Sequence, residues 1–221
     1  LQASNKAGYA YENIDVPDAA YIDGQTALKS VEDLKQFKDD GKPFFLAVGF
    51  VKPHLPFNAP KKYWDLYDPN SIALPENATF PKSAPQRANH KWGELRSYID
   101  IPKTGSIPDA MAKKLIHGYY ASVSYVDAQI GVLIKGLTEL GLRENTVIVL
   151  VGDHGWSLSE HGLWAKHSNF EVALQVPLII SDSRLPNAAR TNSIAELVDI
   201  YPTLCELTAG ESPTHLQGSS L

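Results

Sequence analysis

Cysteine is nearly absent from this sequence, which has only Cys205 among its 221 residues. A single cysteine excludes a disulfide within the chain, so cysteine content does not indicate the redox compartment. Leu204 and Leu207 lie beside it in a helical pattern, which favours a thiol buried in a core. Long apolar runs are missing as well. No stretch approaches the roughly 18 apolar residues that span a bilayer, and we therefore expect no transmembrane segment.

Positive charge is also scarce. The chain has 20 Lys and Arg against 25 Asp and Glu, a net charge of -5, and its basic residues form no run. A nucleic-acid-binding surface needs a basic stripe, so we expect no nucleic-acid partner, and an anionic ligand must be bound by a local pocket. The chain begins without methionine or a visible signal peptide and ends without a clear terminal element, so we expect it to be part of a longer protein.

The residues that are present suffice for one core, because 43% of them are hydrophobic. Helical patterns alternate with buried-strand patterns, which predicts an α/β fold. We expect helices at residues 26–38, 108–141 and 194–207, the last interrupted by Pro202, and strands at residues 43–50, 146–151 and 176–181. The apolar stripe of the long helix is expected at Leu115, Tyr119, Tyr120, Val123, Val126, Ile130, Leu133 and Leu137.

Proline is concentrated in one part of the chain, because nine of the 15 prolines lie between Pro53 and Pro108. Proline removes backbone donors and limits regular structure, so we expect residues 58–108 to be an irregular excursion within the domain. The interspersed tyrosines and tryptophans argue against disorder. A lid that faces a carbohydrate and a packed structural loop fit this composition equally well.

A loop with several glycines at residues 151–167 has the side chains best suited to chemistry. Asp153 and His154 directly follow the expected strand 146–151, and ligands of open α/β sheets bind at the carboxyl ends of strands. A carboxylate and an imidazole can hold a divalent cation there. In the alternative interpretation, Asp153 caps the next turn and His154 is a structural loop residue. His54 follows the expected strand 43–50 and should lie at the same sheet edge.

Four segments of the chain form a recognisable set: FLAVGFVKPHLPF at residues 45–57, YASVSYVD at residues 120–127, GDHGW through EHGLWAK at residues 152–166, and VDIYPTL at residues 198–204. Together they resemble the sulfatase family, and most closely its iduronate-2-sulfatase-like branch. The resemblance implies an alkaline-phosphatase-like fold, in which a large mixed sheet lies between helices. Residues 1–221 would then be the C-terminal part of one catalytic domain, an incomplete domain in themselves.

The resemblance also implies an activity, which is the hydrolysis of sulfate esters on a sulfated sugar or glycosaminoglycan. The family uses a calcium ion and a formylglycine made from cysteine or serine. By family pattern, Asp153 and His154 look like calcium ligands, and His54 and Lys166 look like a catalytic pair that binds the sulfate group. Trp156 looks like a wall of the sugar pocket. The resemblance further implies a secreted, periplasmic or lysosomal protein.

The sequence departs from the family pattern at several points. Neither the Cys-x-Pro-Ser-Arg nucleophile motif nor the metal-binding Asp-Asp pair lies within residues 1–221, and Cys205 is followed by Glu206. We therefore expect an N-terminal segment of the same protein to supply both, and this chain alone to be inactive. Many sulfatases have asparagine where His154 stands, and because histidine suits zinc better than calcium, zinc is the alternative metal. Ser159 stands where the family usually has glycine.

Two other functions remain open at this point. A two-zinc phosphodiesterase or phosphatase of the same superfamily would also place an Asp-His pair after a strand. A non-catalytic protein that binds sulfated sugars would lack the nucleophile altogether. The sequence context of His54 and the presence of Lys166 favour the sulfatase.

Overall fold

The computed structural model describes residues 8–90, 93–185 and 189–221, and it divides the chain into two compact units. Unit 1 comprises residues 1–141 and 154–175, and unit 2 comprises residues 142–153 and 176–221. The helices of unit 1 are α1 (Ile22–Asp40), α2 (Lys61–Trp64), α3 (Asp109–Glu139) and α4 (Glu171–Leu174). Its strands are β1 (Tyr11–Glu12), β2 (Phe57–Asn58), β4 (Ser157–Leu158) and β5 (Trp164–Ala165). Unit 2 has strands β3 (Ile148–Val151) and β6 (Leu178–Ser181) and helix α5 (Ile200–Leu207).

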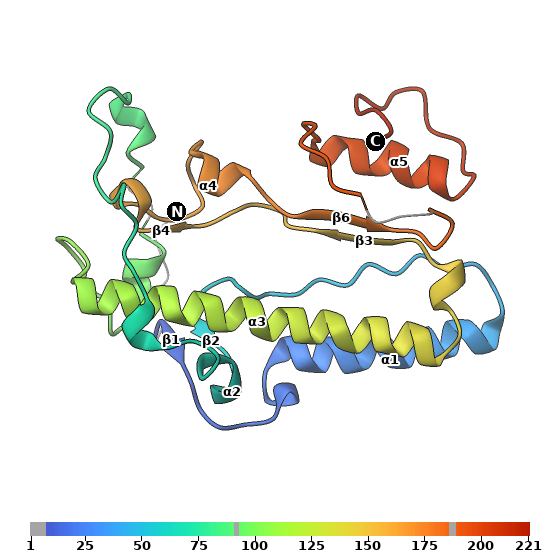
Figure 1. Cartoon of the computed structure of the whole chain (residues 1–221), viewed down its shortest axis with the longest axis horizontal. Coiled ribbons are helices and arrows are strands. Elements are labelled where there is room, and N and C mark those ends of the chain that lie inside the picture. The colour runs from blue at the N-terminus through green and yellow to red at the C-terminus, as the bar shows by residue number, and fades with distance from the viewer. Residues whose placement is uncertain (1–7, 91–92, 186–188) are drawn as a thin grey trace. The chain divides into compact units, whose positions relative to one another are not determined.

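Helices α1 and α3 pack side by side and form the framework of unit 1 (Figure 1). Small residues on α3 allow the close approach. A Cβ atom added at Gly136 would lie 2.8 Å from a methyl carbon of Val31 on α1, and one added at Gly118 would lie 2.8 Å from the ring of Trp64. The expected apolar stripe is therefore partly wrong. Tyr120 and Val123 are each 40% exposed, whereas the buried face includes small and polar residues such as Ala121, Ser122 and Gln129.

The two long helices end where the sequence predicts. The amide of Gly41, which has a φ of 65°, donates hydrogen bonds to the carbonyls of Phe37 and Lys38 at the end of α1. Helix α3 likewise stops just before Gly141, which has a φ of 70°. Glycine reaches this left-handed backbone region without a steric penalty, so it ends a helix at little cost.

The expected strand at residues 43–50 is wrong as a hydrogen-bonded strand. The segment is assigned no regular structure, and its side chains alternate between half-buried and exposed, from Phe44 inward and Phe45 outward. Alternation of this kind is typical of an extended chain. A ladder also needs a neighbouring strand, and the strands of the described residues pair β1 with β2, β3 with β6, and β4 with β5.

In its described residues, 58–90 and 93–108, the irregular segment has one turn of α-helix, α2, and short 3-10 helices at Pro69–Ser71, Gln86–Ala88 and Leu95–Ser97. Much of it is nevertheless packed. Tyr63 and Trp64 are buried with Tyr125 of α3 in one cluster, and Leu95 and Tyr98 belong to the main core of unit 1. The aromatic side chains at these positions stabilise the unit by burying apolar surface.

The main core of unit 1 joins segments that lie far apart in the sequence. Leu55 and Phe57 come from the segment after residue 50, Leu115 comes from α3, and Trp156 and Ala165 come from the segment that contains β4 and β5. Because these side chains are held in one core, the polar residues next to them have fixed positions.

Unit 2 is built on the antiparallel pair of β3 and β6, with Ile148 opposite Ser181 and Val151 opposite Leu178. Both expected strands are confirmed over narrower ranges. The expected burial on both faces is wrong, because the residues of β3 are half-buried or exposed. Pro202 lies in the first turn of α5, where its missing N–H breaks no helical hydrogen bond. Cys205 on this helix is half-buried and not part of a core.

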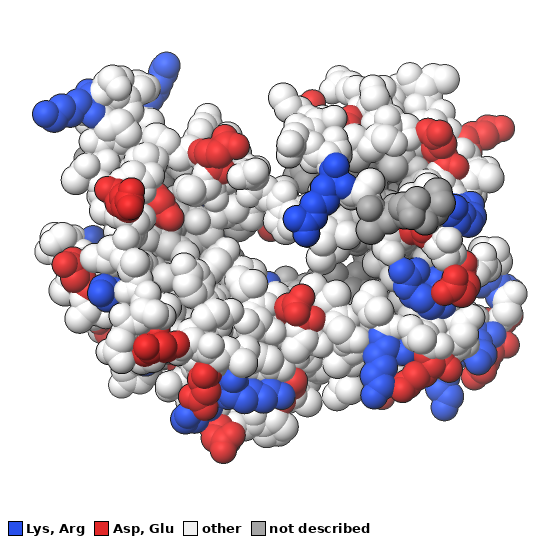
Figure 2. Space-filling view, viewed as in Figure 1, with Lys and Arg blue, Asp and Glu red and all other residues white. Residues whose placement is uncertain are grey.

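The charged side chains of unit 1 are intermingled in sign. Figure 2 shows basic and acidic groups side by side on the face that carries α1 and α2. Exposed i,i+4 pairs such as Lys61 with Asp65 account for part of this pattern, and such pairs contribute little to stability. None of the helices in the described residues is sufficiently long and apolar to cross a membrane.

Candidate active site

The loop that contains His54 is anchored by two buried charged residues. The carboxylate of Asp23 accepts hydrogen bonds from the backbone amides of Val51 at 2.9 Å and Lys52 at 2.8 Å. The ammonium of Lys52 donates to the carbonyls of His54 at 3.2 Å and Pro56 at 2.5 Å. Lys52 is only 7% exposed, and this burial lowers its pKa to about 8. The backbone on both sides of His54 is thus fixed.

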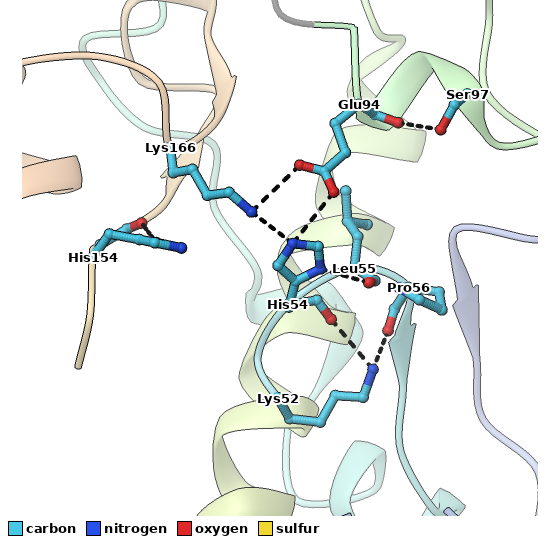
Figure 3. Close-up of polar contacts among 9 residues, drawn as sticks. Lys52, His54, Leu55, Pro56, Glu94, Ser97, His154 and Lys166 are labelled. Atoms are coloured by element: carbon cyan, nitrogen blue, oxygen red, sulfur yellow. Dashed lines mark hydrogen bonds and ion pairs between the residues drawn. The ribbon is translucent and has the colours of Figure 1, made fainter. Parts of the chain in front are cut away.

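His54 contacts Lys166 through the ring nitrogen that faces away from its own backbone (Figure 3). Nδ1 lies 2.7 Å from the carbonyl of Leu55, and since a carbonyl only accepts, Nδ1 has the hydrogen. The Nζ of Lys166 lies 2.6 Å from Nε2. In the neutral ring Nε2 has a lone pair, so Lys166 donates a hydrogen bond to it. Two basic side chains 112 residues apart therefore meet at one point.

The position of Lys166 depends on a loop with strained backbone. Strands β4 and β5 pair antiparallel, and the loop between them has positive φ at Ser159 (87°) and His161 (57°), followed by Ala165 (75°). Each such non-glycine residue costs free energy, and strain of this kind is concentrated at functional sites. The loop is tied down because the amide of His161 donates to the carbonyl of Asn77 at 2.7 Å.

Trp156 lies beneath this pair of basic side chains. Its ring centroid is 5.3 Å from that of His54, with the rings edge to face, and 5.1 Å from the Nζ of Lys166. The indole face attracts the ammonium through a cation–π interaction. The side chain is 7% exposed and belongs to the main core of unit 1. The core thus supports the two basic groups directly.

The comparisons with known proteins place these residues in a family. Residues 3–211 match the family model described as Sulfatase. The chain belongs to the sulfatase family. It is 36% identical to the iduronate 2-sulfatase of Mus musculus over 224 residues, which is 87% of this chain and 41% of that protein. It is also 36% identical to the Homo sapiens iduronate 2-sulfatase, over 90% of this chain and 42% of that protein. The chain thus spans about two fifths of the length of these curated relatives.

Solved structures show the same fold. A phosphonate monoester hydrolase from Silicibacter pomeroyi is similar with a TM-score of 0.77 and 22% identity, over 93% of this chain and 41% of that one. A protein solved in complex with its substrate D-glucosamine-2-N,6-O-disulfate is similar with a TM-score of 0.74 and 22% identity, over 91% of this chain and 51% of that one. The chain therefore has the α/β fold of the alkaline-phosphatase-like class, as the sequence predicts.

The ring of His154 is held by a hydrogen bond to the backbone. Its Nδ1 lies 2.8 Å from the carbonyl of Gly155 and so has the hydrogen, which leaves a lone pair on Nε2. A hydrogen bond of this kind fixes the tautomer that ligates a metal. Asp153 precedes it in the chain and belongs to unit 2. Within the described residues, no group of three or more His, Cys, Asp or Glu side chains is close enough to hold a metal ion.

The sequence of this sulfatase chain does not indicate two residues that contact His54 or Lys166. Glu94 lies 3.3 Å from Nε2 of His54 and 3.5 Å from Nζ of Lys166, yet it comes from the irregular segment and matches no motif. Lys52 stands in the quoted segment KPHLPF, but its role as an anchor of the backbone depends on burial. The position of Lys52 two residues before His54 was the available signal. For Glu94 the sequence has none.

Proposed function

We propose that the complete protein hydrolyses sulfate esters and that His54 and Lys166 bind the sulfate group. The observation that supports this proposal most is the contact between Lys166 and His54 at 2.6 Å, directly above the ring of Trp156. Both side chains are partly buried, with 18% of Lys166 and 30% of His54 exposed. Basic groups fixed in a partly dry site stabilise an anion more strongly than mobile surface groups do.

The chemistry of ester hydrolysis explains why basic groups are needed here. The bond between sulfur and the bridging oxygen breaks, the oxygen leaves with the bonding electron pair and takes up one proton, and water supplies the hydroxyl that remains on sulfur. Negative charge grows on the departing oxygen. Lys166 and the protonated ring of His54 would stabilise this charge and supply the proton, which lowers the barrier because the charge is greatest in the transition state.

The metal is part of the same proposal. Asp153 would supply a carboxylate oxygen and His154 its Nε2 to a calcium ion, with zinc as the alternative. When bound, the ion would neutralise negative charge on the sulfate oxygens. The remaining ligands and the formylglycine nucleophile would come from a segment of the same protein outside residues 1–221, since none of these residues matches the nucleophile motif.

The substrate that we propose is a sulfated sugar or glycosaminoglycan. Support comes from the names of the relatives, since two are iduronate 2-sulfatases and one solved neighbour is bound to a disulfated glucosamine. Trp156 would border the sugar site through the small part of its ring that is exposed. A secreted, periplasmic or lysosomal location fits such a substrate. The irregular segment at residues 58–108 would contribute to the rim of the site through Glu94.

The experiment is replacement of Lys166 by alanine in the full-length protein. We expect turnover of a sulfate ester to fall by about two to three orders of magnitude, the range for losing one contact to transition-state charge. Lys135→Ala is the control, because Lys135 is an exposed lysine of α3 that pairs with Glu139. Unchanged turnover in Lys166→Ala would remove Lys166 from the mechanism, and binding of a sulfated sugar without any turnover by the wild type would favour the non-catalytic alternative.

A further inference from the structure

Glu94 contacts both members of the basic pair. Its Oε1 is 3.3 Å from Nε2 of His54 and its Oε2 is 3.5 Å from Nζ of Lys166, so each carboxylate oxygen faces a different partner (Figure 3). The Glu94 side chain is 11% exposed, less than either partner. A carboxylate removed from water to this extent is stable only when it is well paired.

The backbone at Glu94 is held in place by the core. The carbonyl of Glu94 accepts a hydrogen bond from the hydroxyl of Ser97 at 2.6 Å and another from the amide of Ser97 at 3.1 Å. The short helix that follows, Leu95–Ser97, buries Leu95 and Ser97, and Tyr98 after it is also buried. The carboxylate is therefore directed toward His54 and Lys166 by packed structure.

The charges explain why such a residue is needed. An ammonium and an imidazolium at 2.6 Å would repel each other strongly in a partly dry site. Because Nδ1 of His54 already donates to the carbonyl of Leu55, a second proton on the ring would be placed on Nε2, and Oε1 of Glu94 lies 3.3 Å from this atom.

We propose that Glu94 is a positioning residue that acts as a shared counter-ion for His54 and Lys166, and that it allows both to be cationic when the ester is cleaved. We call this arrangement the Glu94 clamp. The proposal rests on the proposed function, since it assigns Glu94 a role in the same site. The clamp has a cost, because a carboxylate beside the pair also repels a sulfate group. Glu94 should therefore weaken sulfate binding and increase turnover.

The test uses Glu94→Gln in the full-length protein, with two separate readouts. Titration calorimetry with inorganic sulfate should give a dissociation constant about threefold to tenfold lower than in the wild type, because one nearby negative charge is removed. Turnover of an aryl sulfate should fall by about 10- to 100-fold, because His54 loses the partner of its second proton. Glu94→Asp keeps the charge and should recover most of the turnover. Glu76→Gln, an exposed residue of the same irregular segment, should change neither readout.

In Glu94→Gln, sulfate binding should become tighter while turnover falls, and these opposite effects distinguish the clamp from a purely structural role of Glu94. Misplaced active-site residues would weaken sulfate binding and turnover together, and that result would overturn the proposal, as would no change in either readout. If Glu94→Gln does not fold, the same two readouts of Glu94→Asp provide the test. Weaker sulfate binding together with reduced turnover would contradict the clamp. Sulfate binding at least as tight as in the wild type would support it. A wild type that binds sulfate but cleaves no sulfate ester would refute the proposed function alone, and the sulfate affinities would still test the clamp.

Discussion

His54 and Lys166 meet at 2.6 Å although they lie 112 residues apart in the chain. Both could be named from the sequence because they stand in segments that resemble the sulfatase family. Glu94 could not, since a single glutamate in an irregular segment is usually a solvated surface residue. The role that we propose for it depends on burial beside two basic groups, and burial is a property of the folded chain.

Lys52 provides a prediction of pH dependence at the same scale. Its pKa is lowered from 10.5 to about 8 because the side chain is buried. Between these two values the unfolded chain binds a proton that the folded chain does not, so the free energy of unfolding should rise with pH. We expect a gain of about 2 kcal/mol from pH 8 to pH 10, measured by urea denaturation.

Lys52→Met is the comparison for this measurement, because methionine fills a similar volume and does not titrate. The free energy of unfolding of this variant should depend much less on pH over the same range. An equal slope in wild type and variant would show that other groups cause the dependence. Tyr125, whose pKa is raised to about 12 mainly by burial, acts in the opposite direction, and its effect begins only near pH 10.

At the scale of elements, the loop between β4 and β5 has a strained backbone and determines the position of Lys166. Ser159 has a φ of 87°, a backbone region in which glycine is favoured, and the family usually has glycine at this place. The sequence shows that Ser159 departs from the family pattern, but it does not show the effect on stability. The structure shows that Ser159 has the left-handed conformation, which is unfavourable for a non-glycine residue by roughly 1–2 kcal/mol.

Replacing Ser159 by glycine should therefore stabilise the protein. The relief of strain is partly offset by the greater flexibility of glycine in the unfolded chain, so we expect a net gain of about 1 kcal/mol. In a domain of this size that corresponds to an increase in melting temperature of about 2–4 °C, measured by calorimetry. Ser106→Gly is the matched control, since Ser106 is not among the residues with positive φ and its replacement should give no gain. A melting temperature that falls in Ser159→Gly would refute this account of the loop.

The long helices and the paired strands show how well the local sequence pattern predicts a helix or a strand. Helix α3 and the C-terminal end of α1 could be predicted, because helical periodicity and terminal glycines are local signals, whereas α1 begins four residues before the expected start at residue 26. The buried face of α3 was predicted less well, since Gly118 and Gly136 contribute by being small, and apolar periodicity does not detect small residues. The segment at residues 43–50 has the composition of a strand but no ladder partner within the described residues, and composition cannot supply a neighbour.

At the scale of the whole molecule, the fold class follows from the alternation of helices and strands, and the comparisons confirm it. Family membership is likewise established over nearly the whole chain. The resemblance also indicated most of the candidate site, whereas the contacts that join it could not be predicted, because they connect residues from three separate parts of the chain. The irregular segment at residues 58–108 illustrates this best: its prolines predicted irregularity, and its packing brings Glu94 to the site.

The central claim is that the His54–Lys166 pair serves the cleavage of a sulfate ester. The measurement that tests it most directly compares kcat/KM of the full-length protein for an aryl sulfate with kcat/KM for the matching aryl phosphate diester. Our account predicts that the sulfate ester is preferred and that Lys166→Ala removes most of this preference. Preference for the phosphate diester, with activity that depends on two bound zinc ions, would contradict the account and identify the chain as part of a phosphodiesterase.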